Sequence, residues 1–399
     1  MKKVELINVS DANNNKYYYM EEMGSEWKAT WGRIGVTADT KMYSMEVWQS
    51  KYKEKIRKGY KDITALRLDK AATTSFKDMT DSQIKELLDT LQRYSKQHIA
   101  ETYTVSAEQV TPLQVEEAQR IIDVLSLNIC NMDASTINDN LLKLYTTIPR
   151  RMKKTQYHLV DVSEDIAEQR KVAKRIITQE QDNVDVMKQQ VSMQQTDTTS
   201  STTTIEDALG IKIGHITDEE KETIKKMMGS EVSKFRKAFK VTNHSTQRRL
   251  EERKTKSFKS WTKLLWHGSR NENWLNILKT GLLIRPSGAV FTGSMFGNGI
   301  YFANRATKSI GYTSINGSIW ANGRDSKAYL AIYEVNTGME CKTKQRESWM
   351  CSCTAKVLKS RGEYDSLYCE GGIDLKNDEL IVYETDQCSI KYLVEIVKD

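Results

Sequence analysis

Glycine is missing from residue 60 through residue 209, and this gap constrains the fold more than any other feature of the chain. Glycine weakens helices because it loses more backbone freedom on folding than any other residue. A long stretch without it favours a helical bundle. Aromatic and β-branched segments with interspersed glycines lie on both sides of the gap, and they favour strands. A chain of 399 residues is also long for one domain. We therefore expect an α+β protein of several domains, with an all-α part in the middle.

Within the gap, apolar residues recur every three or four positions, which indicates amphipathic helices. Pro112 suits the first turn of one helix, and Asp133 precedes another helical pattern as a capping residue. The longest pattern predicts a single helix from Asp161 to Val191. The run from Gln194 to Thr204 is poor in apolar residues, so we expect an exposed linker there.

The first 70 residues read as strands followed by one helix. This helix is basic, because residues 41–61 hold seven lysines and arginines against two glutamates. Most of the formal net charge of +7 therefore lies in one short region. Such a surface suits an acidic partner, although a solvated helix face is the plainer alternative.

Composition excludes several classes of protein. None of the six cysteines has zinc-ligand spacing, and Cys351-Ser352-Cys353 is too tight, so we expect free thiols and no metal site. No run of 18 apolar residues occurs, so we expect no membrane span. The N-terminus lacks the apolar core of a secretory signal.

Three stretches near the C-terminal end carry polar residues between apolar, strand-forming ones: Leu264–Arg270, Met295–Ala303 and Asn377–Tyr383. Extended backbone beside a glycine can bind a carboxamide, and two tyrosine faces can enclose a nicotinamide ring. A side-chain carboxylate that is hydrogen-bonded to the ribose 2′-hydroxyl can stabilise the positive charge that forms on the sugar when the glycosidic bond breaks. For this role Asp378 competes with Glu379, and the register of the following strand favours Glu379.

The motifs H-G-S, G-I-Y-F-A and N-D-E-L-I-V-Y, in this order, resemble the catalytic block of the poly(ADP-ribose) polymerases. The resemblance implies a mixed α+β ADP-ribosyltransferase domain with antiparallel sheets, which uses NAD as a substrate and needs no metal. The implied catalytic residues are His267, Tyr301 and Glu379. The implied NAD-binding residues are His267, Gly268, Ser269, Tyr301, Lys308, Ser309 and Tyr312. Leu283, with Arg285 nearby, and Ser294 depart from the family pattern at the rim, where an arginine and a tyrosine are usual.

Near the N-terminus, Trp31-Gly32-Arg33-Ile34-Gly35 resembles the tryptophan–glycine–arginine (WGR) module of the DNA-dependent members of this family. The resemblance implies that DNA is bound by Asn15, Trp31, Arg33, Lys55 and Tyr60. Burial of Trp31 in a core is the alternative. The helical middle resembles the family's regulatory subdomain, which blocks NAD entry until DNA binds.

These resemblances predict four parts: a WGR module at 1–75, a helical regulatory domain at 80–192, a linker at 193–204 and a catalytic domain at 205–399. The expected activity is transfer of ADP-ribose to proteins, the enzyme itself included, in response to DNA breaks, with chain elongation. A DNA-end binding protein with a vestigial transferase fold, a mono-ADP-ribosyltransferase and an NAD glycohydrolase are the alternatives. We expect a monomer without membrane contact, nuclear by resemblance, or cytoplasmic if the source is bacterial or viral.

Overall fold

The computed structural model describes residues 2–12, 14–34, 36–67, 76–194, 203–256, 261–284 and 295–398. Gly35, most of the expected linker, Arg285 and Ser294 lie outside these ranges, so the expectations on them have no structural counterpart. The described residues divide into two compact units. The first holds residues 2–67 and 96–194, and the second holds 76–95, 203–256, 261–284 and 295–398.

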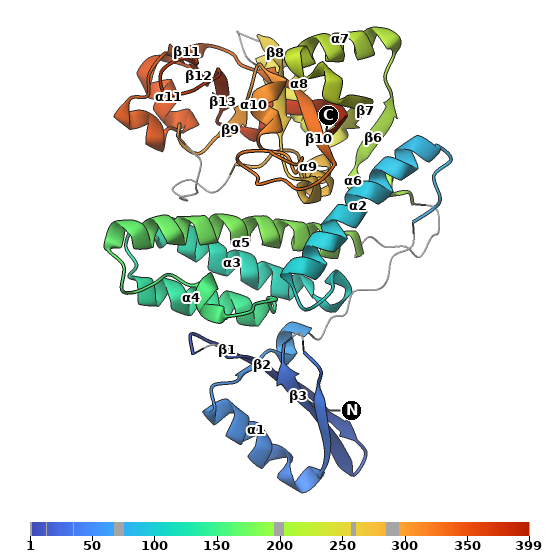
Figure 1. Ribbon diagram of the computed structural model, residues 1–399, viewed down its shortest axis with the longest axis vertical. Helices are drawn as coiled ribbons and strands as arrows, with labels where there is room; N and C mark the ends of the chain where they lie inside the picture. The colour runs from blue at the N-terminus through green and yellow to red at the C-terminus, as the bar shows by residue number, and fades with distance from the viewer. Residues whose placement is uncertain are drawn as a thin grey trace. The chain divides into compact units, whose positions relative to one another are not determined.

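The first unit begins with an antiparallel sheet in the order β4-β3-β2-β1-β5, counted over the described residues (Figure 1). Its strands are β1 (Lys3–Ser10), β2 (Asn14–Met23), β3 (Glu26–Arg33), β4 (Asp39–Ser44) and β5 (Lys61–Asp62). Helix α1 (Trp48–Arg57) follows β4 and buries Trp48 against Trp27 of the sheet, whose ring lies 5.3 Å away. This small apolar core, in which Trp27 and Trp48 are the largest side chains, holds the helix to one face of the sheet.

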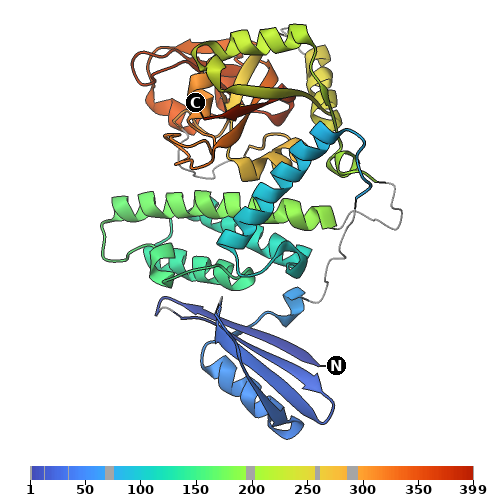
Figure 2. The same cartoon turned by 45° about the vertical axis from the view of Figure 1, so that its right-hand side comes forward.

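The described part of the glycine-free stretch folds mainly into helices, as the sequence predicts, and four of them are long. They are α2 (Ser82–Thr102), α3 (Pro112–Asn128), α4 (Ala134–Thr147) and α5 (Ile166–Gln194), and α3 packs between α4 and α5 (Figure 2). Asp133 caps α4 as expected, accepting a hydrogen bond of 2.7 Å from the Thr136 N–H. The predicted start of the last helix at Asp161 is wrong, because Asp165 caps it instead by accepting from the N–H groups of Ala167 and Glu168.

Direct contacts join the sheet and the helices inside the first unit. Asn15 is fully buried, and its Nδ2 donates to the carbonyl oxygen of Arg150 at 3.3 Å. Arg33 donates to the carbonyl oxygen of Lys153 at 2.9 Å. The WGR-like module and residues 96–194 of the bundle therefore fall into one unit, and the division into separate domains at the predicted boundaries stays a prediction.

The second unit contains two sheets among the described residues, in the orders β6-β7-β14-β10-β8 and β11-β12-β13-β9. The first sheet is formed by β6 (Ile211–His215), β7 (Phe235–Asn243), β8 (Thr262–Gly268), β10 (Lys327–Asn336) and β14 (Cys388–Val397). The second is formed by β9 (Ile300–Phe302), β11 (Glu340–Thr343), β12 (Ser366–Cys369) and β13 (Glu379–Val382). The helices are α6 (Ile205–Leu209), α7 (Asp218–Met228), α8 (His244–Lys256), α9 (Trp274–Thr280), α10 (Ala306–Ile310) and α11 (Ala355–Gly362).

The mixed α+β architecture is confirmed, and among the described residues of the second unit the strand pairs are antiparallel except β11 with β12, which is parallel.

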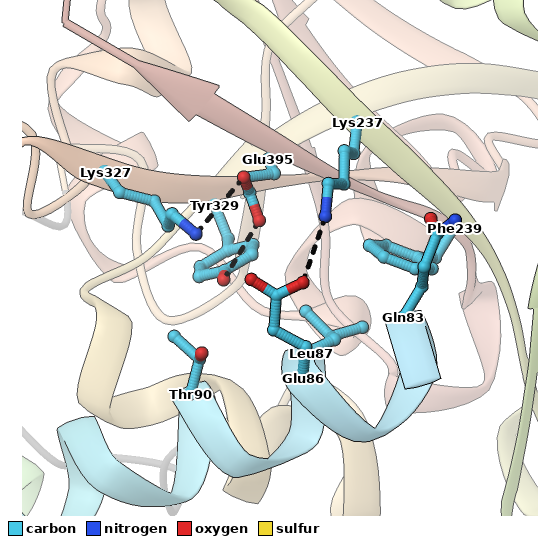
Figure 3. Close-up of a pocket in the computed structure, with 9 residues that line it drawn as sticks. All are labelled: Gln83, Glu86, Leu87, Thr90, Lys237, Phe239, Lys327, Tyr329 and Glu395. Carbon is cyan, nitrogen blue, oxygen red and sulfur yellow. Dashed lines mark hydrogen bonds and ion pairs between the residues drawn. The ribbon is translucent and has the colours of Figure 1, made fainter. Parts of the chain in front are cut away.

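The first turns of α2 belong to the second unit and dock on β7, β10 and β14 (Figure 3). Glu86 of α2 pairs with Lys237 at 3.2 Å, and Lys327 pairs with Glu395 at 3.3 Å. These side chains line a small pocket together with Gln83, Leu87, Thr90, Phe239 and Tyr329. The pocket is occupied by ion pairs and contains no residue of the predicted catalytic set, so it serves to attach the helix.

Candidate active site

The predicted catalytic residues meet where the two sheets of the second unit join. Trp266 of β8 and Ala303, which follows β9, exchange two backbone hydrogen bonds of 2.8 and 2.9 Å. Strand β9 also pairs with β13, and Tyr301 lies opposite Ile381. The single bridge at Trp266 and Ala303 therefore brings His267, Tyr301 and Glu379 into one region, although more than 100 residues of sequence separate the first from the last.

His267 lies half-buried on β8, with its ring edge-on to those of Phe302 and Tyr333. Its Nδ1 is 3.0 Å from the carbonyl oxygen of Tyr301. A carbonyl oxygen only accepts, so Nδ1 carries the proton and Nε2 of the neutral ring is an acceptor. Burial lowers the pKa of His267, which favours this neutral form. The side chain can therefore accept a hydrogen bond from a substrate hydroxyl.

Gly268 packs directly against the backbone of α10. A Cβ at this position would lie 2.8 Å from the carbonyl carbon of Ser309 and closer still to its oxygen. Only glycine fits, and α10 is thereby held beside β8. Ser309 is buried, and the hydroxyl of Ser269 accepts from Asn273 at 3.1 Å. The predicted nicotinamide-binding glycine and serine therefore face each other through their backbones.

Tyr301 is fixed by its hydroxyl group. The hydroxyl donates to the carbonyl oxygen of Gly297 at 2.6 Å and accepts from the N–H of Phe296 at 3.1 Å. Gly297 has a φ of +79°, and a Cβ there would collide with the backbone of Cys353. Burial raises the pKa of Tyr301, so its hydroxyl remains protonated. The ring consequently has one orientation beside the predicted catalytic carboxylate.

Glu379 is the first residue of β13, and only 8% of its surface is exposed. Its Oε1 lies 2.9 Å from Nζ of Lys308 on α10. The same Nζ donates to the carbonyl oxygen of Asn377 at 3.3 Å. Burial raises the pKa of Glu379, and the ammonium of Lys308 acts against that rise. Lys308 thus supports the ionised carboxylate in a position from which water is largely excluded.

Tyr312, the second predicted stacking residue, is 42% exposed and lies against Trp320. The two rings are nearly parallel, at 21° with centroids 6.2 Å apart. The backbone N–H of Trp320 donates to the carbonyl oxygen of Gly311 at 2.9 Å, which holds the loop beside α10. Sequence reasoning missed Trp320, and the available signal was a large aromatic residue in a loop rich in glycine, serine and asparagine.

The predicted DNA-binding residues lie in the first unit and differ in their surroundings. Trp31 is half-buried and stacks on Tyr18, with centroids 5.9 Å apart. Lys55 places Nζ 3.9 Å from the ring centre of Tyr18 and 5.5 Å from that of Tyr60. Arg33 is engaged with Lys153 and Asn15 is interior, as described above. Trp31, Lys55 and Tyr60 form one cluster, whereas Asn15 and Arg33 face the helices, and DNA binding by all five stays a prediction.

Within the described ranges, no group of three or more histidine, cysteine, aspartate or glutamate side chains is arranged to hold a metal ion. All six cysteines, which lie in those ranges, are free thiols. The described helices include none that is both long and apolar enough to cross a membrane.

Comparison with known proteins assigns the second unit to a family. Residues 215–398 match the family of the poly(ADP-ribose) polymerase catalytic domain. A putative poly [ADP-ribose] polymerase-like protein, 100L, of Invertebrate iridescent virus 6 is 36% identical over 179 residues, which are 42% of this chain and 91% of the viral protein. Human poly [ADP-ribose] polymerase 2 is 59% identical over 49 residues, which are 12% of this chain and 8% of the human protein. The poly [ADP-ribose] polymerase of Sarcophaga peregrina is 31% identical over 172 residues, 37% of this chain and 17% of its own length.

Proposed function

Because the chain belongs to the poly(ADP-ribose) polymerase family and is an ADP-ribosyltransferase that uses NAD as its substrate, we propose that it modifies proteins, itself included, and elongates the product into poly(ADP-ribose). We further propose that DNA strand breaks stimulate this transfer. The observation that carries the proposal is the buried Lys308–Glu379 pair, which lies on the elements next to His267 and Tyr301.

The nicotinamide end of NAD binds where α10 meets β8. The backbone of Gly268 and the hydroxyl of Ser309 bind the carboxamide, and Tyr301 and Tyr312 present ring faces to the nicotinamide. The close approach of Gly268 to Ser309 supports this assignment, because it places both groups at one end of α10. Ser269 lines the same end of β8.

His267 and Glu379 act on the ribose. Nε2 of His267 accepts a hydrogen bond from a ribose hydroxyl, since Nδ1 is the protonated nitrogen. Glu379 accepts from the 2′-hydroxyl and stabilises the positive charge that develops on the sugar as the C1′–N bond breaks. The bonding electrons leave with nicotinamide, which becomes neutral. The acceptor then forms the new bond to C1′ and loses its proton.

Elongation requires that a ribose hydroxyl of an attached ADP-ribose takes the place of the protein acceptor. Glu379 is suited to orient that hydroxyl, because its carboxylate has two oxygens and the described contacts to Lys308 involve Oε1. Lys308 lies at the acceptor side of the carboxylate. Elongation and single transfer are therefore distinguished by product length.

DNA stimulation is assigned to residues 1–75, with the helical region 80–192 acting as the regulator of the catalytic region 205–399. The cluster of Trp31 and Lys55 with the rings of Tyr18 and Tyr60 supports it, because an aromatic face and a cation suit an exposed base and a phosphate. Asn15 and Arg33 contribute by joining this module to the helical region. A nuclear location follows for a DNA-dependent enzyme, with the cytoplasm as the alternative for a bacterial or viral source.

The test is incubation of the purified protein with labelled NAD, with and without nicked DNA, followed by a denaturing gel. We expect labelled protein of increasing length, stimulated by DNA. Glu379→Gln should abolish elongation and leave NAD binding largely intact, whereas Trp31→Ala should reduce only the response to DNA. A single short product would indicate mono-transfer, and free ADP-ribose without labelled protein would indicate a glycohydrolase. DNA binding without NAD consumption would indicate a vestigial transferase.

A further inference from the structure

Asp378, the residue just before Glu379, is bound by three donors from two separate segments of the second unit. Its Oδ1 accepts from the backbone N–H of Gly371 at 2.9 Å. Its Oδ2 accepts from the hydroxyl of Tyr368 at 2.6 Å and from Nδ2 of Asn304 at 2.7 Å. Hydrogen bonds to an ionised carboxylate are shorter and stronger than neutral ones. These donors hold the pKa of Asp378 below its usual range, first through the Gly371 N–H. The carboxylate therefore serves as an anchor, and its oxygens are engaged by protein groups.

The donors belong to the segments that carry the active site. Tyr368 and Gly371 lie on β12 and the turn after it, which leads to β13 and Glu379. Asn304 lies on the connection from β9 to α10, between Tyr301 and Lys308. The bond between Asn304 and Asp378 thus ties the segment of the lysine and the tyrosine to the segment of the catalytic glutamate.

A second tie lies a few residues further along both segments. Lys308 contacts the carboxylate of Glu379 at 2.9 Å and the carbonyl oxygen of Asn377 at 3.3 Å. The segments 304–308 and 377–379 are therefore joined at both ends, by Asn304 with Asp378 and by Lys308 with Glu379. Strands β9 and β13 pair next to these ties, with Phe302 opposite Leu380. Loss of the first tie therefore leaves the strand pairing and the Lys308 contact to hold the segments together.

We propose that Asp378 is a positioning residue, which fixes the Glu379 carboxylate relative to Lys308 by binding Asn304, Tyr368 and the Gly371 N–H. This inference rests on the proposed function of Glu379. Asp378 does not touch the substrate in this role and acts through its neighbour. Because Glu379 acts on the charge that develops in the transition state, displacement of its carboxylate lowers kcat more than it raises KM for NAD.

The test exchanges the donor and the acceptor of the Asn304–Asp378 bond. Asp378→Asn replaces one acceptor oxygen by an amide that faces donors, and Asn304→Asp places two carboxylates against each other. Each single variant should lower kcat for NAD consumption about tenfold, which corresponds to about 1.4 kcal/mol. KM for NAD should change less than about twofold, a split expected when only transition-state contacts are lost. The double variant N304D/D378N restores a bond of reversed direction and should recover kcat to within about threefold of wild type, a rescue expected of coupled neighbours.

Asp374→Asn is the matched control, because Asp374 lies in the same connection between β12 and β13 and accepts from the N–H of Arg346, away from the 304–308 segment. It should leave kcat unchanged. Thermal melting of each variant shows whether it is folded. Wild-type kcat in Asp378→Asn, or a folded double variant no more active than the worse single one, would overturn the positioning role. Failure of the wild-type protein to consume NAD would instead overturn the proposed function itself.

Discussion

The ammonium nitrogen of Lys308 lies 2.9 Å from Oε1 of Glu379, and about a tenth of each side chain is exposed. This contact joins helix α10 to strand β13, and it favours the ionised form of the carboxylate on which the proposed chemistry depends. Burial raises the pKa of Glu379, whereas Lys308 opposes that rise. A buried ion pair with one partner removed leaves the other charge uncompensated.

Lys308→Met should therefore shift the pH dependence of kcat. Without the ammonium, the rise caused by burial is unopposed, so the pKa of Glu379 increases further. Because the ionised carboxylate is the active form, activity should be lost at a higher pH as the solution is acidified. The measurement is kcat for NAD consumption across the acid range. Lys308→Arg keeps the cation and should retain the wild-type acid limb. If kcat of Lys308→Met were lost at the same pH as in the wild type, or at a lower pH, this account would be contradicted.

Gly268→Ala should disrupt the junction between β8 and α10. The added methyl would collide with the carbonyl group of Ser309, and both contacts are backbone, which cannot move aside as a side chain can. Overpacking of this kind costs about 1–3 kcal/mol, and we expect NAD consumption to fall at least about tenfold. Gly214→Ala is the matched control, because a Cβ at Gly214 of β6 meets no heavy atom within 4 Å. Equal NAD turnover in the two variants would show that the approach of Gly268 to Ser309 is unimportant.

The three residues proposed to be catalytic could be named from the sequence because each lies inside a short motif whose order along the chain is informative. His267, Tyr301 and Glu379 needed no tertiary information to be named. The structure adds the physical reason for their meeting, which is the backbone bridge between Trp266 and Ala303.

Contacts that depend on distant residues were out of reach of the sequence. Asn304 lies 74 residues from Asp378, and no local pattern connects them. The burial of Asn15 was equally unpredictable from the sequence, since its hydrogen-bond partner Arg150 lies 135 residues away. An asparagine in a turn-rich segment reads as exposed, and only tertiary packing places it in the interior. Helix starts were predictable where a cap preceded the first apolar residue, as at Asp133, and wrong where apolar Val162 preceded the true cap at Asp165.

Trp320→Ala should weaken NAD binding. The indole stacks on Tyr312, whose other surroundings are open enough to leave it 42% exposed, so the stack limits the motion of the tyrosine ring. Aromatic pairs contribute about 0.5–1.5 kcal/mol beyond burial, so KM for NAD should rise about two- to tenfold. Trp320→Phe retains a ring, so its KM for NAD should lie between those of the wild type and Trp320→Ala. The neighbouring Ile319 is 77% exposed, and Ile319→Ala should leave KM unchanged. Equal KM values in the Trp320 and Ile319 variants would exclude the stack from NAD binding.

Glu180→Gln should destabilise the first unit more than any exposed charge substitution there. Glu180 of α5 accepts from Nε of Arg150 at 2.8 Å, and the two side chains are only 6% and 3% exposed. The guanidinium also lies 3.9 Å from the ring centre of Tyr103, so removal of the glutamate charge leaves an uncompensated cation in the core. Loss of one partner of such a pair costs about 3 kcal/mol or more. Chemical denaturation followed by circular dichroism measures this cost.

Glu117→Gln is the control, because it removes the exposed pair with Arg120, in which Oε2 of Glu117 and Nε of Arg120 are 2.8 Å apart. It should cost less than about 0.5 kcal/mol. Because the backbone carbonyl of Arg150 also binds Asn15, the buried pair supports one of the contacts between the WGR-like module and the helices. A Glu180→Gln protein as stable as Glu117→Gln would show that the cation is compensated by other groups.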